Sequence, residues 1–118
     1  MPFPPGKLPL DVLDRLLSTH TTQDDPRVVV GARVGEDAAV IDFGDRYLVA
    51  KTDPITFATN EIGHYAIHVN ANDIATMGAQ PRWFLATLLL PENNTDETLV
   101  ESIFASLHKS AQEIGVAI

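Results

Sequence analysis

A predicted β-hairpin constrains the fold of this chain more than any other feature. Two short apolar segments, 38–43 and 47–52, flank a turn at 44–45 that starts with glycine. Glycine suits the first central position of a two-residue hairpin turn, because that position needs a positive φ angle. The turn fixes the register, so Ile41 faces Leu48 and the other cross-strand pairs follow.

Three acidic segments lie at the ends of predicted elements: GEDAAV at 35–40, KTDP at 51–54 and NANDIATMGAQP at 70–81. Each places a carboxylate at the edge of an otherwise apolar element, which is unfavourable unless a cation lies beside it. In the hairpin register Asp37 faces Thr52, so we expect the first two segments to meet at the open end of the hairpin.

The third acidic segment belongs to a predicted helix at 60–77, which is capped by Asn60 and stopped by Gly78. Apolar side chains at helical spacing form one stripe on this helix, and Asp73 falls inside that stripe. The apolar members of the stripe are Ile62, Ala66, Val69 and Met77. A lone carboxylate on the predicted buried face of a helix needs a partner.

The remaining pattern predicts an α+β fold. We expect a short helix at 9–17, a polar loop at 18–27 and a short strand at 28–30. After the hairpin and the helix at 60–77, we expect a buried strand at 83–90 and a long helix at 95–114, which is capped by Thr95 and ended by Gly115. Residues 116–118 are expected to start a further strand. This order favours a two-layer sandwich with helices on one face of a mixed sheet. The hairpin strands are apolar on both faces, so we expect a partner to cover the other face.

Composition limits the classes of function. The chain has 118 residues, enough for one domain, and we expect a lead and short helix at 1–30 before the domain at 31–118. A net charge of −8 argues against nucleic-acid binding, which needs a basic surface. There is no apolar run near the ~20 residues of a membrane span, no signal peptide and no cysteine, so we expect a cytoplasmic protein without disulfides.

Asp37, Asp53 and Asp73 are the candidate metal ligands. Two carboxylates ~4 Å apart repel each other by roughly 4 kcal/mol at an effective dielectric constant of about 20. Mg²⁺ removes that repulsion, because it prefers carboxylate oxygens together with waters and substrate phosphates. We hypothesise that the three aspartates hold Mg²⁺ bridged to a nucleotide polyphosphate. The acidic charge of the chain does not oppose this, since the cation lies between protein and ligand.

Each of these polar residues also has a structural interpretation. Asp53 precedes a proline, as is common where loops begin, and Asp37 suits a solvated turn before a strand. Asp73 can accept hydrogen bonds from its own helix or from the preceding loop. Asn70 and Asn72, taken alone, are typical of caps or packing amides near the end of a helix.

His64 and His68 lie one helical turn apart, a spacing that can bind zinc. The sequence shows no third ligand near them. We therefore interpret both histidines as ordinary surface or core side chains.

The three acidic segments, in this order, resemble the N-terminal domain of the aminoimidazole ribonucleotide (AIR) synthase superfamily. The matching residues are GEDAAV at 35–40, Thr52 with Asp53, and NDIATMGAQP at 72–81, and the resemblance covers about residues 30–118. The superfamily includes that purine-pathway synthase, the hydrogenase-maturation protein E, thiamine-monophosphate kinase and selenophosphate synthetase. This chain looks most similar to the hydrogenase-maturation branch.

The resemblance implies an α+β domain whose homodimer pairs two sheets into a β-barrel, with ATP bound across the interface. It implies that Asp37, Asp53 and Asp73 bind Mg²⁺ and the nucleotide phosphates, and that Thr52 and Asn72 belong to the same nucleotide-binding site. Members of the family use ATP to activate a carbonyl, amide or thiocarbamate oxygen, or phosphorylate a small molecule directly. The acceptor here, a small molecule or a protein-borne group, stays open.

The chain also departs from the family pattern. Glu36 stands where the family usually has a first aspartate, and the family's second domain and its Gly-Gly-His/Asp-Thr motif would follow Ile118. The hydrogenase-maturation protein carries its substrate on a C-terminal cysteine, a residue type that is absent here. We therefore expect an ATP-binding and dimerisation half that ends before its last strand, lacks the C-terminal domain and is inactive alone. The alternatives are a non-catalytic dimerising module of the same fold and a thiamine-monophosphate kinase-like phosphotransferase.

Overall fold

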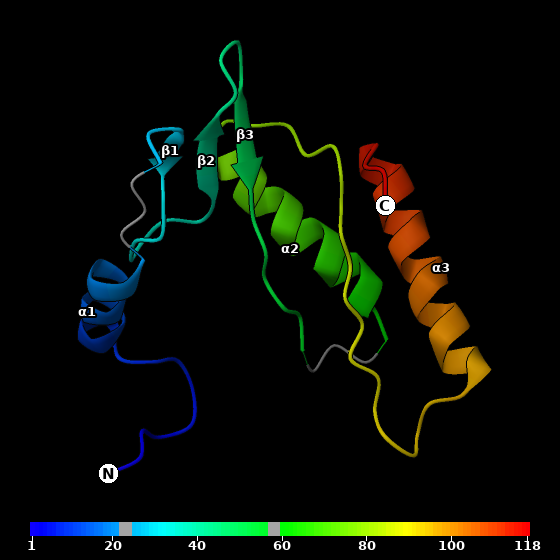
Figure 1. Cartoon of the computed structure of the whole chain (residues 1–118). Coiled ribbons are helices and arrows are strands. Elements are labelled where there is room, and N and C mark those ends of the chain that lie inside the picture. Colours follow the sequence, from blue (N-terminus) through cyan, green and yellow to red (C-terminus); the bar gives the residue numbers. More distant parts are fainter. Residues whose placement is uncertain (22–24, 57–59) are drawn as a thin grey trace. The chain divides into compact units, whose positions relative to one another are not determined.

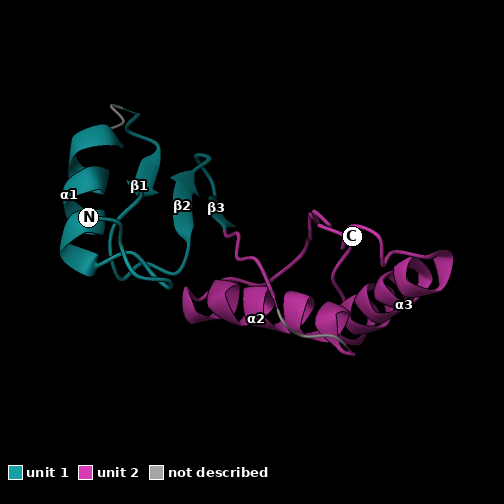
Figure 2. Ribbon diagram, turned by 90° about the horizontal axis from the view of Figure 1, so that it is seen from below, with its two compact units in different colours: residues 1–50 teal, residues 51–118 magenta. Residues whose placement is uncertain are grey.

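The computed structural model describes residues 1–21, 25–56 and 60–118. Figure 1 draws the whole chain, coloured along the sequence. The described residues fall into two units, unit 1 at 1–50 and unit 2 at 51–118. Figure 2 colours unit 1 teal and unit 2 magenta. Each unit has its own helices and its own contacts.

The sheet of unit 1 contains β1 (Val28–Val30), β2 (Ala39–Asp42) and β3 (Tyr47–Ala50), in the order β1-β2-β3. The short strand expected at 28–30 is confirmed. Both neighbouring pairs are antiparallel, so the described sheet is not the mixed sheet that the sequence predicted.

The predicted hairpin register is confirmed. Ile41 faces Leu48, and the other cross-strand pairs of β2 and β3 follow the same register. Gly44 has a φ angle of 91°, and its amide donates a 2.7 Å hydrogen bond to the carboxylate of Asp42. The positive φ angle explains why glycine stands at this position of the turn.

Helix α1 (Leu10–His20) continues past its predicted end at residue 17. The polar loop expected at 18–27 is therefore wrong at its start. The hydroxyl of Ser18 donates a 3.0 Å hydrogen bond to the carbonyl of Arg15 inside the helix, so its polarity is satisfied without ending the helix. The part of the predicted loop at 22–24 lies outside the described residues.

Unit 2 contains α2 (Ile62–Thr76) and α3 (Glu97–Ile114), which pack against each other. The core between them consists of the buried side chains of Ile67, Leu107 and Ala111. Burial of these apolar groups is the main force that holds the two helices together.

Gly63 allows α2 and α3 to approach closely. A Cβ atom at this position would lie 2.4 Å from the backbone nitrogen of Leu107 and 2.5 Å from Oγ of Ser106. Both separations are far shorter than a van der Waals contact. The packed face of α2 is therefore the face that carries Gly63.

The starts of both helices in unit 2 differ from the predicted caps. Asp96, and not Thr95, caps α3, because its carboxylate accepts a 2.8 Å hydrogen bond from the amide of Leu99. An aspartate at this position also favours the helix through the macrodipole. Helix α2 follows Glu61, so Asn60 lies one residue too early to cap it.

The two glycines predicted to end the helices of unit 2 are confirmed. Gly78 follows α2 with a φ angle of 77°, and Gly115 follows α3 with a φ angle of 71°. Both values lie in the left-handed region that glycine adopts without strain. The amide of Gly78 donates a 2.9 Å hydrogen bond to the carbonyl of Ala75, which satisfies a carbonyl of the last turn.

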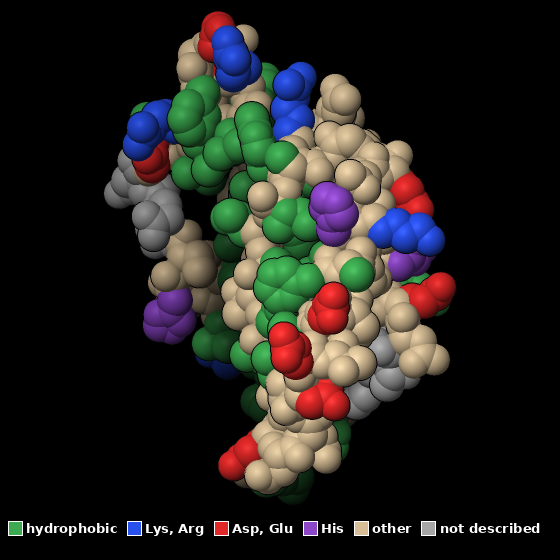
Figure 3. Space-filling model, turned by 90° about the vertical axis from the view of Figure 1, so that its right-hand side faces the viewer, with side chains coloured by type: hydrophobic (Ala, Val, Ile, Leu, Met, Phe, Trp, Pro, Cys, Tyr) green, Lys and Arg blue, Asp and Glu red, His purple; other side chains and the backbone are tan. Residues whose placement is uncertain are grey.

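The apolar segment 83–90 is not the buried strand that the sequence predicted. Within the described part of unit 2 its ladder pairing is limited to one parallel bridge between Trp83 and Ala117. The strand expected at the end of the chain amounts to the same bridge. Leu85 and Leu89 are 98% and 94% exposed, and Figure 3 shows hydrophobic side chains at the surface. An apolar run becomes a buried strand only where a partner supplies a ladder of hydrogen bonds.

Three helices and a three-stranded antiparallel sheet make the described chain an α+β protein, which is the predicted class. The covering of one sheet face by helices and the closing of a barrel in a homodimer stay predictions. Among the residues that the structure describes, no helix is long and apolar enough to cross a membrane.

Candidate functional site

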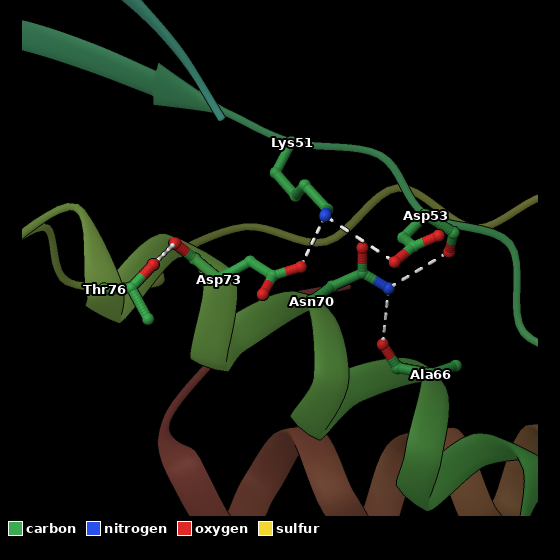
Figure 4. A network of polar contacts seen from close by, with 6 residues as sticks. All are labelled: Lys51, Asp53, Ala66, Asn70, Asp73 and Thr76. Atoms are coloured by element: carbon green, nitrogen blue, oxygen red, sulfur yellow. Dashed lines mark hydrogen bonds and ion pairs between the residues drawn. The ribbon is translucent and has the colours of Figure 1, made fainter. Parts of the chain in front are cut away.

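The side chain of Lys51 brings two of the predicted metal ligands together in unit 2. Its Nζ atom forms an ion pair with Oδ2 of Asp73 and lies 3.6 Å from Oδ2 of Asp53 (Figure 4). The lysine side chain is only 14% exposed, whereas those of Asp73 and Asp53 are 25% and 43% exposed. The site therefore opens to solvent on the side of the carboxylates. We call Lys51, Asp53 and Asp73, with Asn70 described below, the carboxylate site.

The electrostatics of the carboxylate site keep Lys51 charged. The hydrogen bond to Asp73 is the largest cause that raises the pKa of Lys51 above its usual value, and burial opposes it. The charges of Asp73 and Asp53 raise the pKa further. One ammonium between two carboxylates leaves one net negative charge in the site, which favours a further cation.

Asn70 ties the segment after β3 to helix α2. Its side-chain amide nitrogen donates to the carbonyl of Asp53 at 3.3 Å and to the carbonyl of Ala66 at 2.8 Å. Its Oδ1 atom is buried and has no hydrogen-bond partner among the described residues. Figure 4 shows the side chain of Asn70 with the two carbonyls that accept from its amide nitrogen. A buried amide oxygen without a donor fits a site that receives a cation or a ligand.

The most buried face of α2 differs in part from the predicted stripe that contains Asp73. Gly63 and Ile67 are the buried residues of this helix, and they face α3. The predicted stripe through Ile62 and Met77 is only partly buried, because the close approach at Gly63 selects a different face for packing. The carboxylate of Asp73 pairs with the ammonium of Lys51, which is the partner that a partly buried carboxylate needs.

Thr52 and Asn72, the other two residues predicted to bind the cofactor, are exposed. Thr52 separates Lys51 from Asp53 along the chain, and Asn72 precedes Asp73 on α2. Among the described residues no hydrogen bond joins either side chain to the carboxylate site. Their role in nucleotide binding stays a prediction.

Asp37 belongs to unit 1, where it is exposed just before β2. Its neighbour Glu36 forms a 3.3 Å ion pair with Arg33 in the same turn. The expected meeting of Asp37 with Asp53 and Asp73, which come from unit 2, stays a prediction.

Sequence reasoning gave no role to Lys51 and treated Asn70 as a cap or packing amide. The signal for Asn70 was its spacing, since residues three apart on a helix share a face and Asp73 follows it by three. The signal for Lys51 was a cation at the start of an acidic segment, two residues before Asp53. Neither signal shows that both side chains meet Asp53, because that contact depends on how the segment after β3 crosses α2.

Comparisons with known proteins place this chain in a family. Residues 35–118 match the family model described as AIR synthase related protein, N-terminal domain. The match covers well over half of the chain, and the chain belongs to this family. The predicted resemblance is therefore confirmed. No solved structure matches the chain significantly.

Similar proteins carry several different names. The chain is 34% identical to thiamine-monophosphate kinase of Pyrococcus horikoshii, over 72% of this chain and 30% of that protein. It is 31% identical to carbamoyl dehydratase HypE of Rhodobacter capsulatus, over 96% and 33%. It is 32% identical to phosphoribosylformylglycinamidine cyclo-ligase of Thermococcus kodakarensis, over 72% and 28%. The chain thus spans about a third of the length of these relatives.

Proposed function

We propose that this domain binds Mg²⁺ and ATP through the carboxylate site. The observation that carries the proposal is the meeting of Asp53 and Asp73 at Lys51, beside the buried and unpartnered oxygen of Asn70. The net negative charge of the site attracts a cation, and the ammonium of Lys51 offers a contact to an anionic ligand. Membership of the AIR synthase related family supports the same assignment.

The donor atoms of the site fit Mg²⁺. The carboxylates of Asp53 and Asp73 and the amide oxygen of Asn70 are hard oxygen ligands of the kind this ion prefers. Asp37 of unit 1 is proposed to add a further carboxylate. When bound, Mg²⁺ neutralises charge on the phosphates.

Lys51 is proposed to bind the nucleotide phosphates. Its ammonium has three donors, and one of them is held by Asp73. The raised pKa keeps it positively charged at neutral pH. The ion pair with Asp73 thereby orients the ammonium, and its remaining donors are proposed to contact a phosphate oxygen.

The domain is proposed to work as a homodimer. The segment 83–90 presents Leu85 and Leu89 to solvent, and beyond its first residues it has no ladder among the described residues. Backbone that is extended and unpaired is a site for pairing with another strand. A second copy of this domain is the proposed partner, as the family resemblance implies.

The reaction of the whole protein is a further part of the proposal. We propose an ATP-dependent synthase or dehydratase related to hydrogenase maturation, in which this domain alone is inactive. The second candidate is phosphotransfer, which the 34% identity to thiamine-monophosphate kinase favours. The relatives share the domain but not the named activity, so the acceptor must be defined by residues beyond the matched third of their length.

Binding of a fluorescent ATP analogue, with and without Mg²⁺, tests the proposed function. We expect Mg²⁺-dependent binding that weakens at least tenfold in Asp53→Asn and in Asp73→Asn. Asp14→Asn, which removes an exposed carboxylate of α1, serves as the matched control and keeps the affinity of the wild type. Circular dichroism checks that the variants are folded. Absence of Mg²⁺-dependent binding in a folded wild type favours the non-catalytic dimerising module instead.

A further inference from the structure

The packed helices of unit 2 bring together a second set of ligand side chains. His64 and His68 come from α2, and Glu113 comes from the last turn of α3. One ligand atom from each of the three residues lies within 4.8 Å of the others. The third ligand that the sequence did not show near the two histidines is therefore present in the fold.

The backbone frame under this cluster is fixed by packing. Ile67 precedes His68 and is 1% exposed, and Ala111 lies one half-turn before Glu113 and is 2% exposed. Both belong to the core between the helices. The close approach at Gly63 sets the distance between the two helix axes. The three ligands thus stand on rigid elements and not on loops.

The two histidine rings already face each other. The ring centroids of His64 and His68 lie 4.2 Å apart, as expected for side chains at i and i+4 on one helix face. Two histidines at i and i+4 on one helix face have a spacing that is known to bind one zinc ion.

The imidazole of His68 carries a polar atom without a partner. Its Nε2 atom is buried and has no hydrogen-bond partner among the described residues. Oε2 of Glu113 is 3.9 Å away, which is too long for a hydrogen bond. A metal ion between the imidazole and the carboxylate would satisfy both groups.

We propose that His64, His68 and Glu113 form a site for a divalent transition-metal ion of the zinc type. Two imidazoles and one carboxylate suit such an ion, whereas Mg²⁺ prefers oxygen ligands alone. Tetrahedral ligands at zinc bond lengths lie about 3.4 Å apart, so the side chains must close in by up to about 1.4 Å. The side chains of His64 and Glu113 are exposed and can rotate to do so. The fourth position is left for water or an external ligand.

Zinc binding by the tag-free full chain tests the proposal, with a chromophoric zinc chelator as competitor. The wild type is expected to bind one equivalent of Zn²⁺. His64→Ala, His68→Ala and Glu113→Gln are each expected to weaken binding at least tenfold. His108→Ala and Glu101→Gln are the matched controls, because both change exposed side chains of α3 outside the cluster, and both are expected to bind as the wild type does.

Thermal unfolding separates a lost site from a lost fold. Zn²⁺ is expected to raise the Tm of the wild type and of His108→Ala, and to leave the Tm of Glu113→Gln unchanged. Glu113→Gln keeps the size of the side chain, so it should fold without metal. Zinc affinity that survives in all three ligand variants, or that falls equally in His108→Ala, would overturn the proposal. Asp53→Asn should bind zinc normally, which makes this site distinguishable from the carboxylate site.

Discussion

Lys51 forms an ion pair with Asp73 and lies 3.6 Å from Asp53, so the chain itself supplies one cation to its pair of carboxylates. The sequence suggested that a divalent ion was needed to bring these aspartates together. The lysine removes part of that need and leaves a site with one net negative charge. The carboxylates can then bind a metal ion, while the ammonium of Lys51 binds a phosphate.

The raised pKa of Lys51 predicts how stability depends on alkaline pH. A group whose folded pKa exceeds its unfolded value of about 10.4 stabilises the fold fully below that pH and loses its contribution as the pH rises through the folded pKa. Urea unfolding of the wild type should therefore show falling stability above about pH 10.4. Lys51→Arg, which stays charged, should lose less stability over the same range. Equal losses in both proteins would show that this ion pair does not stabilise the fold.

Gly63→Ala should destabilise unit 2. Its new Cβ atom meets the backbone nitrogen of Leu107 at 2.4 Å, and a backbone atom cannot move aside without shifting α3. We expect the free energy of unfolding to fall by about 1–3 kcal/mol, despite the better helix propensity of alanine. Urea denaturation measures it. Ala75→Gly, at an exposed position of α2, is the propensity control, and a stabilised Gly63→Ala protein would contradict the described helix packing.

The cap of α3 gives a test that separates the structure from the sequence-based prediction. Asp96→Ala removes the carboxylate that accepts from the amide of Leu99, so the free energy of unfolding should fall by about 1 kcal/mol. Thr95→Ala should cost less, because the hydroxyl of Thr95 donates to the carbonyl of Pro91 outside the helix. The Tm values of the two variants decide between the caps. A larger loss in Thr95→Ala would restore the cap first predicted.

Local chemistry explains which parts of the fold could be predicted from the sequence. The turn at Gly44 sets the hairpin register, and Gly78 and Gly115 end helices. These features could be predicted because glycine adopts a positive φ angle without strain, whatever surrounds it. The predicted strand at 83–90 was wrong because its formation depends on a partner elsewhere in the fold. An apolar run indicates a preference for burial, but a strand also needs a ladder partner that the run does not encode.

In the carboxylate site too, some residues could be predicted from the sequence and their contacts could not. Asp53 and Asp73 were predicted from the motifs that carry the family resemblance, and the structure brings these two together. Their contact with Lys51 and the approach of Glu113 to the histidines were not predicted. Both depend on tertiary packing at α2, where Gly63 selects the face that meets α3. Which face of α2 packs against α3 could not be predicted from a single sequence.

The exposed apolar segment predicts self-association. Leu85 and Leu89 are almost fully exposed, so replacing both with serine should weaken the proposed homodimer at least tenfold. Light scattering over a range of protein concentrations measures the change. Leu10→Ser, at an exposed position of α1, is the matched control and should leave association unchanged. A wild type that stays monomeric at high concentration would contradict the proposed dimer.

The most direct test of the proposed magnesium site is paramagnetic NMR with Mn²⁺ in place of Mg²⁺, in the presence of ATP. Mn²⁺ broadens signals of nuclei close to the ion. We predict that small amounts of Mn²⁺ broaden the side-chain amide signals of Asn70 and the backbone amide signals of Asp53 and Asp73 first, and that excess Mg²⁺ restores them. Sharp Asn70 signals at Mn²⁺ concentrations that broaden other parts of the chain would contradict a metal site between these two aspartates.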